Sequence, residues 1–227
     1  MINVKEDWNP KQNLLKEIIS KPDRFDEAIN LCLKMHSLVH TSEMSNVNSI
    51  TYEDILWAGL SESVFRLLSG NKNNSIAWNL WHLTRIEDIT ANILIADSSQ
   101  IINKKWLKKL NTKVLDTGNA MTKKEVEEFS NEINMNELRN YRIEVGRKTQ
   151  NIIKNLKPKD LKRKMTQKQL DRIVEEGGVL QAEDSMWLID FWGRKTVSGI
   201  ILMPITSHQI VHLNNSLKIK ENAKANC

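Results

Sequence analysis

The sequence predicts an all-α protein built as a bundle of four long helices, and three observations favour this fold class. The 227 residues include only 8 glycines and 4 prolines, so long stretches of the chain contain no turn signal. Apolar residues recur every three or four positions, which is the period of a helix with one buried face. No segment shows the period-two alternation of β-branched residues that indicates a strand. We interpret residues 1–227 as a single domain with a core of about 24–219, since a chain of this length can bury a sufficient core by itself.

The first predicted elements are a short helix and then a long one. The short helix begins at Asn9-Pro10, where a capping residue precedes a proline in the first turn, and Pro22 ends it. The first long helix is expected over residues 24–41. Thr51 and Asp54 then mark the start of another short helix. One face of the 24–41 helix carries Phe25, Ile29, Cys32, His36 and Val39.

The second long helix is expected over residues 75–97, in the segment SIAWNLWHLTRIEDITANILIAD. Its apolar positions are spaced three or four residues apart, which predicts a helix with one face toward the core. That inward stripe comprises Trp78, His82, Ile86, Ile89, Ile93 and Ala96. A histidine therefore lies in the middle of a buried face.

Two more long helices complete the bundle. Thr122 and Glu125 form a capping box before a short helix, and a long helix follows over residues 136–156, where Pro158 ends it. The last helix is expected over residues 197–219. Pro204 lies inside this helix and removes one backbone hydrogen bond, so we expect a kink near residues 200–204.

Composition excludes several classes of protein. The two cysteines, Cys32 and the terminal Cys227, do not form a disulfide framework, which indicates a reducing cytoplasm. The first residues have no apolar signal-peptide core, and no apolar run approaches the ~20 residues that span a bilayer, so we expect no membrane partner. The net charge of +5 comes from basic stretches near residues 104 and 154. We interpret them as solvated surface and expect no specific nucleic acid, because no base-reading motif accompanies them.

The histidines form the clearest chemical pattern. Four of the five occur in two HxxxH pairs, His36 with His40 and His208 with His212. Residues four apart on a helix share a face, so each pair can bind one ion with both imidazoles. His82 is the best third ligand for the second pair, because its stripe faces the core. Three histidines leave a coordination position open for water or substrate, which is typical of a catalytic metal site.

Other residues are weaker alternatives to this assignment. His36 is an additional candidate ligand, because it lies on the inward face of its helix. Glu43 is a candidate catalytic group, either orienting a ligand or acting as a base, although an exposed loop position explains it equally well. Arg85 is a second candidate that could anchor an anionic substrate; the simpler interpretation is a surface ion pair with Glu87 or Asp88.

The two histidine-bearing helices resemble those of a known family. NSIAWNLWHLTRIEDITANILI is similar to the second helix of DinB/YfiT-like proteins, and TVSGIILMPITSHQIVHLNN resembles their fourth helix. The resemblance spans roughly residues 24–219, with extra length around 100–135 and 157–195. It implies a four-helix bundle with up-and-down connections and short helices in the connections. It also implies a metal, often nickel or zinc, held at one end of the bundle by three histidines, which by position are His82, His208 and His212.

The resemblance also suggests an activity. Members of the family include transferases that use low-molecular-weight thiols such as bacillithiol or mycothiol, and a thiol-dependent isomerase. We therefore expect a metal-dependent thiol S-transferase whose partners are a small-molecule thiol and an electrophile. Its pocket would be walled by Trp78 and Trp81. Two alternatives stay open: a metal-dependent hydrolase using Glu43 or Glu87 as base, and a non-catalytic metal-binding stress-response protein. A homodimer is likewise an open alternative to a monomer.

Overall fold

The computed structural model describes residues 4–69 and 74–225. Every regular element within these two ranges is a helix, which confirms the predicted all-α class. Lys164 and Thr196 form one isolated antiparallel bridge there. None of the helices in this part of the chain is long and apolar enough to cross a bilayer. Cys227 lies outside the described residues.

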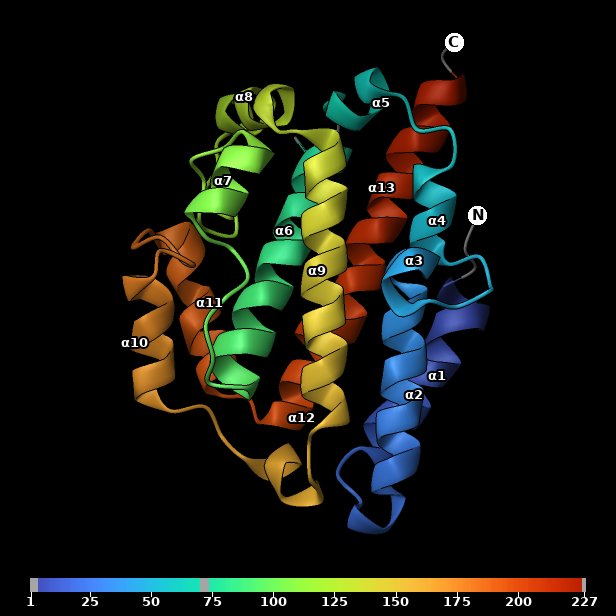
Figure 1. The fold of residues 1–227 in the computed structure, drawn as a ribbon, viewed down its shortest axis with the longest axis vertical. Helices are drawn as coiled ribbons and strands as arrows, with labels where there is room; N and C mark the ends of the chain where they lie inside the picture. Colours follow the sequence, from blue (N-terminus) through green and yellow to red (C-terminus); the bar gives the residue numbers. More distant parts are fainter. Residues whose placement is uncertain (1–3, 70–73, 226–227) are drawn as a thin grey trace.

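Four long helical segments lie side by side and make up the body of the molecule (Figure 1). α6 contacts both α9 and α13, and α2 contacts α9 and the segment that precedes α13. The first three segments match the predicted spans to within a few residues, and the fourth runs to Ala225, beyond the predicted end at residue 219. The segments are α2 (Phe25–Leu38), α6 (Ile76–Ile89) with the π-helix η3 (Thr90–Ile95), α9 (Met135–Lys154), and α12 (Val197–Ile200) with the π-helix η5 (Ile201–Ser207) and α13 (His208–Ala225).

Short helices fill the connections, as expected. α7 and α8 lie at one end of α6 and α9, whereas α10 and α11 lie along the side of α6 (Figure 1). These four occupy the two stretches predicted to hold the extra length. The short elements are η1 (Val4–Trp8), α1 (Asn9–Ile18), η2 (Pro22–Arg24), α3 (Ser42–Ser45), α4 (Tyr52–Trp57), α5 (Glu62–Arg66), α7 (Lys104–Leu110), α8 (Lys123–Glu132), η4 (Pro158–Lys162), α10 (Gln167–Glu175) and α11 (Glu183–Gly193).

Local capping explains where several helices begin. The predicted capping box of Thr122 with Glu125 is present, and the expected helix start at Thr51 and Asp54 is a capping box too. The Ser75 hydroxyl accepts a hydrogen bond from the Trp78 backbone and so starts α6. These side chains satisfy backbone donors that the first helical turn leaves without partners. The first helix differs slightly from prediction, because its cap position falls one residue before the expected Asn9.

α6 is buried on every side, and the prediction of a single inward stripe is therefore wrong. All residues of α6 and η3 are buried except Trp78, which is half-buried. The reason is position: α9, α13, α5 and α8 all contact this helix. The polar side chains of α6 consequently need partners inside the protein, because a buried polar group without a hydrogen bond is costly.

Where the sequence predicts a kink at residues 200–204, the structure has the π-helix η5. Proline has no N–H to donate, and the local backbone widens into η5 before α13 begins. The Thr206 hydroxyl donates to the Ile201 and Leu202 carbonyl oxygens at 2.9 and 3.0 Å. The Gln209 amide donates to the Pro204 carbonyl oxygen at 3.2 Å. Side chains thus satisfy carbonyl groups beside the irregular turn that leads into the His208–His212 pair.

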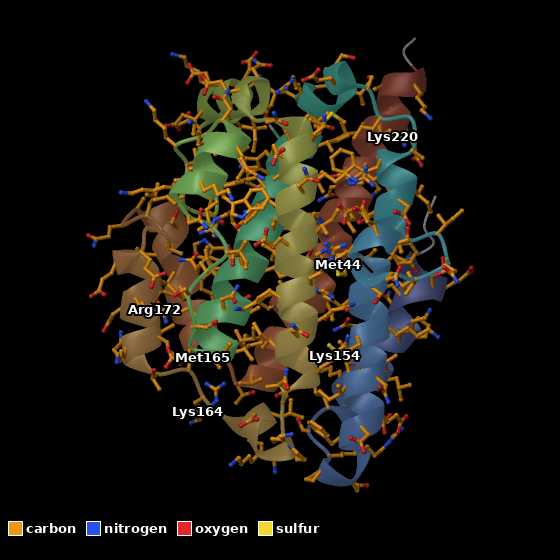
Figure 2. The ribbon with its side chains drawn as sticks, in the orientation of Figure 1. Met44, Lys154, Lys164, Met165, Arg172 and Lys220 are labelled. Carbon is orange, nitrogen blue, oxygen red and sulfur yellow. The ribbon has the colours of Figure 1, made fainter. Side chains whose placement is uncertain are left out.

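A buried lysine joins the far end of α13 to α4. Figure 2 labels Lys220 on α13 beside α4. Its ammonium donates to the carbonyl oxygens of Ile55, Leu56 and Ala58 at 2.8, 2.9 and 2.6 Å. A cation is favourable there, because the last carbonyl groups of a helix carry partial negative charge. This contact fixes the last helix against the short helices that precede α6.

Candidate metal centre

Three imidazoles from two helices meet in the bundle. His82 comes from the middle of α6, and His208 and His212 come from the first turns of α13. One nitrogen of each ring lies within 4.8 Å of the other two. The Nε2 atoms of His82 and His208 are 3.2 Å apart. Two ligands bound tetrahedrally at ~2.0–2.1 Å would lie about 3.3 Å apart, so this separation suits a zinc-like ion.

Hydrogen bonds behind the rings orient two of the three imidazoles. His82 Nδ1 lies 2.7 Å from the Thr117 carbonyl oxygen, which can only accept, so Nδ1 carries the proton and Nε2 the lone pair. His212 Nδ1 lies 2.9 Å from Asn79 Oδ1 in the same kind of contact. Metal-bound histidines commonly donate their second N–H in this way. Neither acceptor was predicted from the sequence. Asn79 could have been found from its position, because it lies three residues before His82 on the same helix.

The local environment keeps His82 and His208 neutral. Burial lowers the pKa of His82 to about 4, and the hydrogen bond to the Thr117 carbonyl only partly opposes this effect. Burial, followed by the proximity of His82, lowers the pKa of His208 well below its ordinary value. Neutral imidazole is the form that binds metal ions. The site therefore presents nitrogen lone pairs at pH 7 without first having to release protons.

A cavity of about 410 Å³ opens beside the three histidines. Trp78 stacks on His82, with ring centroids 4.6 Å apart and planes 8° from parallel. None of the described residues that line the cavity is charged. The lining residues are Trp78, His82, Ile86, Asn119, Trp187, Leu188, Phe191, Trp192, Met203, Pro204, His208 and His212. The aromatic residues of α11 were not predicted as part of the site.

Two sequence-based assignments around the pocket are corrected by the structure. Arg85 is fully buried and pairs with Asp88 at 2.9 Å and with the Tyr141 hydroxyl at 2.9 Å. It does not line the cavity, so it neither anchors a substrate there nor forms a surface ion pair. Trp81 is also buried and donates to the Asp116 carbonyl oxygen at 3.1 Å. Trp78 alone of the two tryptophans walls the pocket.

Glu43 lies on the surface of the molecule. It is exposed on α3, and its carboxylate lies 3.4 Å from the Arg139 guanidinium. It is not among the residues that line the cavity. The structure therefore gives Glu43 no contact with the three histidines, in agreement with the simpler interpretation of an exposed acid.

The second HxxxH pair forms a separate buried cluster with Glu87. His36 Nε2 lies 2.7 Å from one carboxylate oxygen of Glu87, and His40 Nε2 lies 2.9 Å from the other. All three side chains are fully buried. His36 therefore does not join the site of His82, and Glu87 is neither exposed nor near the cavity, contrary to the sequence-based alternatives. Gly146 of α9 permits this packing, since a Cβ there would lie 2.8 Å from the His40 ring.

Both clusters have donor sets that could hold a metal ion, but their geometries differ. In the Glu87 cluster each imidazole meets its own oxygen at an ordinary N–H···O distance, which describes a hydrogen-bonded His–Glu–His triad. Burial alone raises the pKa of Glu87, yet its interactions with His40 and His36 outweigh this and lower it well below the ordinary value. Burial lowers the pKa of His40 to about 3. The three-histidine cluster, with its outer acceptors and adjacent cavity, is the better candidate for a metal centre.

Comparison with known proteins supports the resemblance seen in the sequence. A family model of the DinB superfamily matches residues 52–214, well over half of the chain. The matched region includes all three histidines of the site and the residues that orient them. A search of the curated proteins found no match.

Proposed function

The chain belongs to the DinB superfamily, and from this premise we propose that it is a metal-dependent enzyme whose ion is held by His82, His208 and His212. The observation on which the proposal depends is the 3.2 Å approach of two imidazole nitrogens beside an open cavity. Three neutral nitrogen ligands suit nickel or zinc. We also infer that the four long segments form the up-and-down bundle of the family.

The reaction we propose is transfer of a small thiol to an electrophile. A divalent ion held by neutral ligands favours thiolate over thiol near neutral pH. The sulfur lone pair forms the new bond to the electrophilic carbon, the leaving group departs with the electrons of the broken bond, and the thiol proton passes to solvent. The protein's own contribution is positioning: Trp78 restrains the His82 ring, and the α11 side chains shield the cavity from water.

The cavity lining favours thiol transfer over hydrolysis. A hydrolase of this kind needs a carboxylate within reach of the attacking water, and none of the described lining residues is acidic. None of the described lining residues is a cation that could hold the carboxylates of a bacillithiol-like thiol, and Arg85 is buried away from the cavity. The charged parts of such a thiol would therefore stay in solvent while its sulfur enters the cavity.

Metal content tests the first part of the proposal. Untagged protein purified without added metal should contain one equivalent of ion, and the His82→Ala and His208→Ala variants should lose it. Val211→Ala is a matched control, because Val211 lies between the two α13 histidines, is 55% exposed and does not line the cavity. Retention of the ion by both histidine variants would disprove the assignment.

Conjugation kinetics test the second part. Metal-loaded wild type should accelerate reaction of a generic electrophile with at least one of several small thiols, and His212→Ala should not. If the loaded wild type gives no rate above the uncatalysed reaction with any thiol, the non-catalytic metal-binding alternative replaces the transferase.

A further inference from the structure

One wall of the cavity is built from aromatic side chains of α11. Trp187 and Phe191 lie four residues apart on α11 and so share a face of that helix. Their ring centroids are 6.1 Å apart with an edge-to-face inclination. Trp187 lines the cavity and is nevertheless 51% exposed. A large aromatic side chain so exposed beside a cavity is typical of a binding surface.

We propose that this wall binds an uncharged aromatic molecule, which would be the electrophilic co-substrate of the enzyme; this second part rests on the proposed transferase function. The ring of the ligand would lie among Trp187, Phe191 and Trp78, because all three line the same cavity. The electrophilic carbon would then be held next to the open side of the histidine cluster. α11 lies along the side of α6 (Figure 1), and its aromatic residues line the same cavity as residues of α6 and α13.

The charges around the cavity favour a neutral ligand. An anion would be drawn to the ion itself, where it would compete with the thiolate, because none of the described residues that line the wall is cationic. Aromatic faces can attract a cation. A cationic ligand would, however, face the ion held by three neutral histidines. It would also approach the Lys195 ammonium, which lies 4.2 Å from the centre of the Phe191 ring.

The size of the cavity sets the scale of the ligand. Its volume of about 410 Å³ falls within the range of small-molecule pockets, ~300–1,000 Å³. A cavity of ~150 Å³ already accommodates benzene. The space beside the histidines therefore accepts a substituted ring of one or two cycles together with the reacting group of a thiol. Apolar lining with a single amide, Asn119, offers few hydrogen bonds to a strongly polar ligand.

The test measures binding of three unreactive aromatic probes to the zinc-loaded full-length protein. They are neutral 2,4-dinitrotoluene, anionic 3,5-dinitrobenzoate and cationic phenyltrimethylammonium, each titrated by isothermal calorimetry. We expect the neutral probe to bind at least tenfold more tightly than the cationic probe and more tightly than the anionic probe. Phe191→Ala should weaken its binding by about 2–12-fold, the range expected for loss of one aromatic contact. This variant keeps all seven tryptophans, so quenching of their fluorescence by the nitroaromatic ring provides a second readout.

The controls separate this inference from the proposed function. Val211→Ala should bind the probe like wild type, since that side chain is exposed on α13 outside the cavity. Tighter binding of either charged probe, or equal binding by Phe191→Ala and wild type, would overturn the inference. Binding of the neutral probe by a protein that takes up no zinc would instead disprove the proposed enzyme and leave the aromatic site standing. Thermal melting of each variant verifies that the fold is intact.

Discussion

The amide of Asn79 holds the His212 ring in the orientation that the proposed metal site requires, and its removal should weaken metal binding. Asn79 Oδ1 lies 2.9 Å from His212 Nδ1 and 3.1 Å from Asn74 Nδ2. Asn79→Ala deletes this acceptor, so His212 can rotate and change tautomer. Loss of one such outer contact costs typically about 10–100-fold in metal affinity, or ~1.4–2.7 kcal/mol. The variant should also lose ~1–3 kcal/mol of unfolding free energy, because the buried Asn74 amide loses its partner.

Competition with a chromophoric zinc chelator at pH 7.5 measures this effect directly. Asn79→Asp is the matched control, since it keeps an oxygen acceptor at the same place and should hold zinc as tightly as wild type or more so. Circular dichroism and thermal melting show whether each variant is folded. A folded Asn79→Ala protein whose zinc dissociation constant stays within a factor of two of wild type would refute the orienting role.

Three further predictions follow from the packing. Gly118 has φ +76° and a Cβ there would lie 2.8 Å from a neighbouring indole nitrogen, so Gly118→Ala should cost ~2–4 kcal/mol in urea unfolding. Gly59 has φ +65° and no atom within 4 Å of an added Cβ, so Gly59→Ala should lower the unfolding free energy only by the ~1–2 kcal/mol of backbone strain. If the two variants lost equal stability, the predicted clash at Gly118 would be wrong. Lys220→Met removes three hydrogen bonds at the end of α4 and should lower the unfolding free energy by ~2 kcal/mol, measured in the same way. Stability should also fall in acid, because below pH 6.5 His40 becomes protonated in the unfolded chain, whereas its pKa in the folded protein is lowered to about 3. The unfolding free energy should then decrease by up to ~1.4 kcal/mol per pH unit. The folded pKa of Glu87 is also lowered, so the stability that its carboxylate contributes is lost as pH falls below 4.5. Denaturant unfolding curves that do not change between pH 7.5 and 5 would rule out a buried neutral His40.

The features that the sequence predicts well are local ones. Helix spans follow from residue periodicity and capping residues, both of which act within a few positions of the chain. The same is true of His208 and His212, whose four-residue spacing places them on one helix face before any tertiary contact forms. His82 was identified by its place in an apolar stripe. These signals were enough to identify three candidate ligands on two helices.

The features that the sequence missed depend on packing between distant segments. Arg85, Glu87 and Asp88 look like a surface charge run, because buried charged residues are rare. They are buried because α6 lies at the centre of the bundle, where Asp88 pairs with Arg85 and the His36–His40 pair meets Glu87. The Thr117 carbonyl that orients His82 comes from a loop 35 residues away, and no side-chain pattern marks a backbone acceptor.

The burial of α6 on all sides has a consequence for the kinetics of the site. Backbone amides in an element so enclosed should exchange with solvent mainly through global unfolding. α13 differs, since it follows the π-helix η5, and its exposed Val211 lies between the two ligands it supplies. Release of an ion should therefore begin at the η5–α13 junction, on the side where the cavity opens, while His82 stays fixed. The residence time of the metal would then report the local opening rate of one helix end rather than the global stability of the protein.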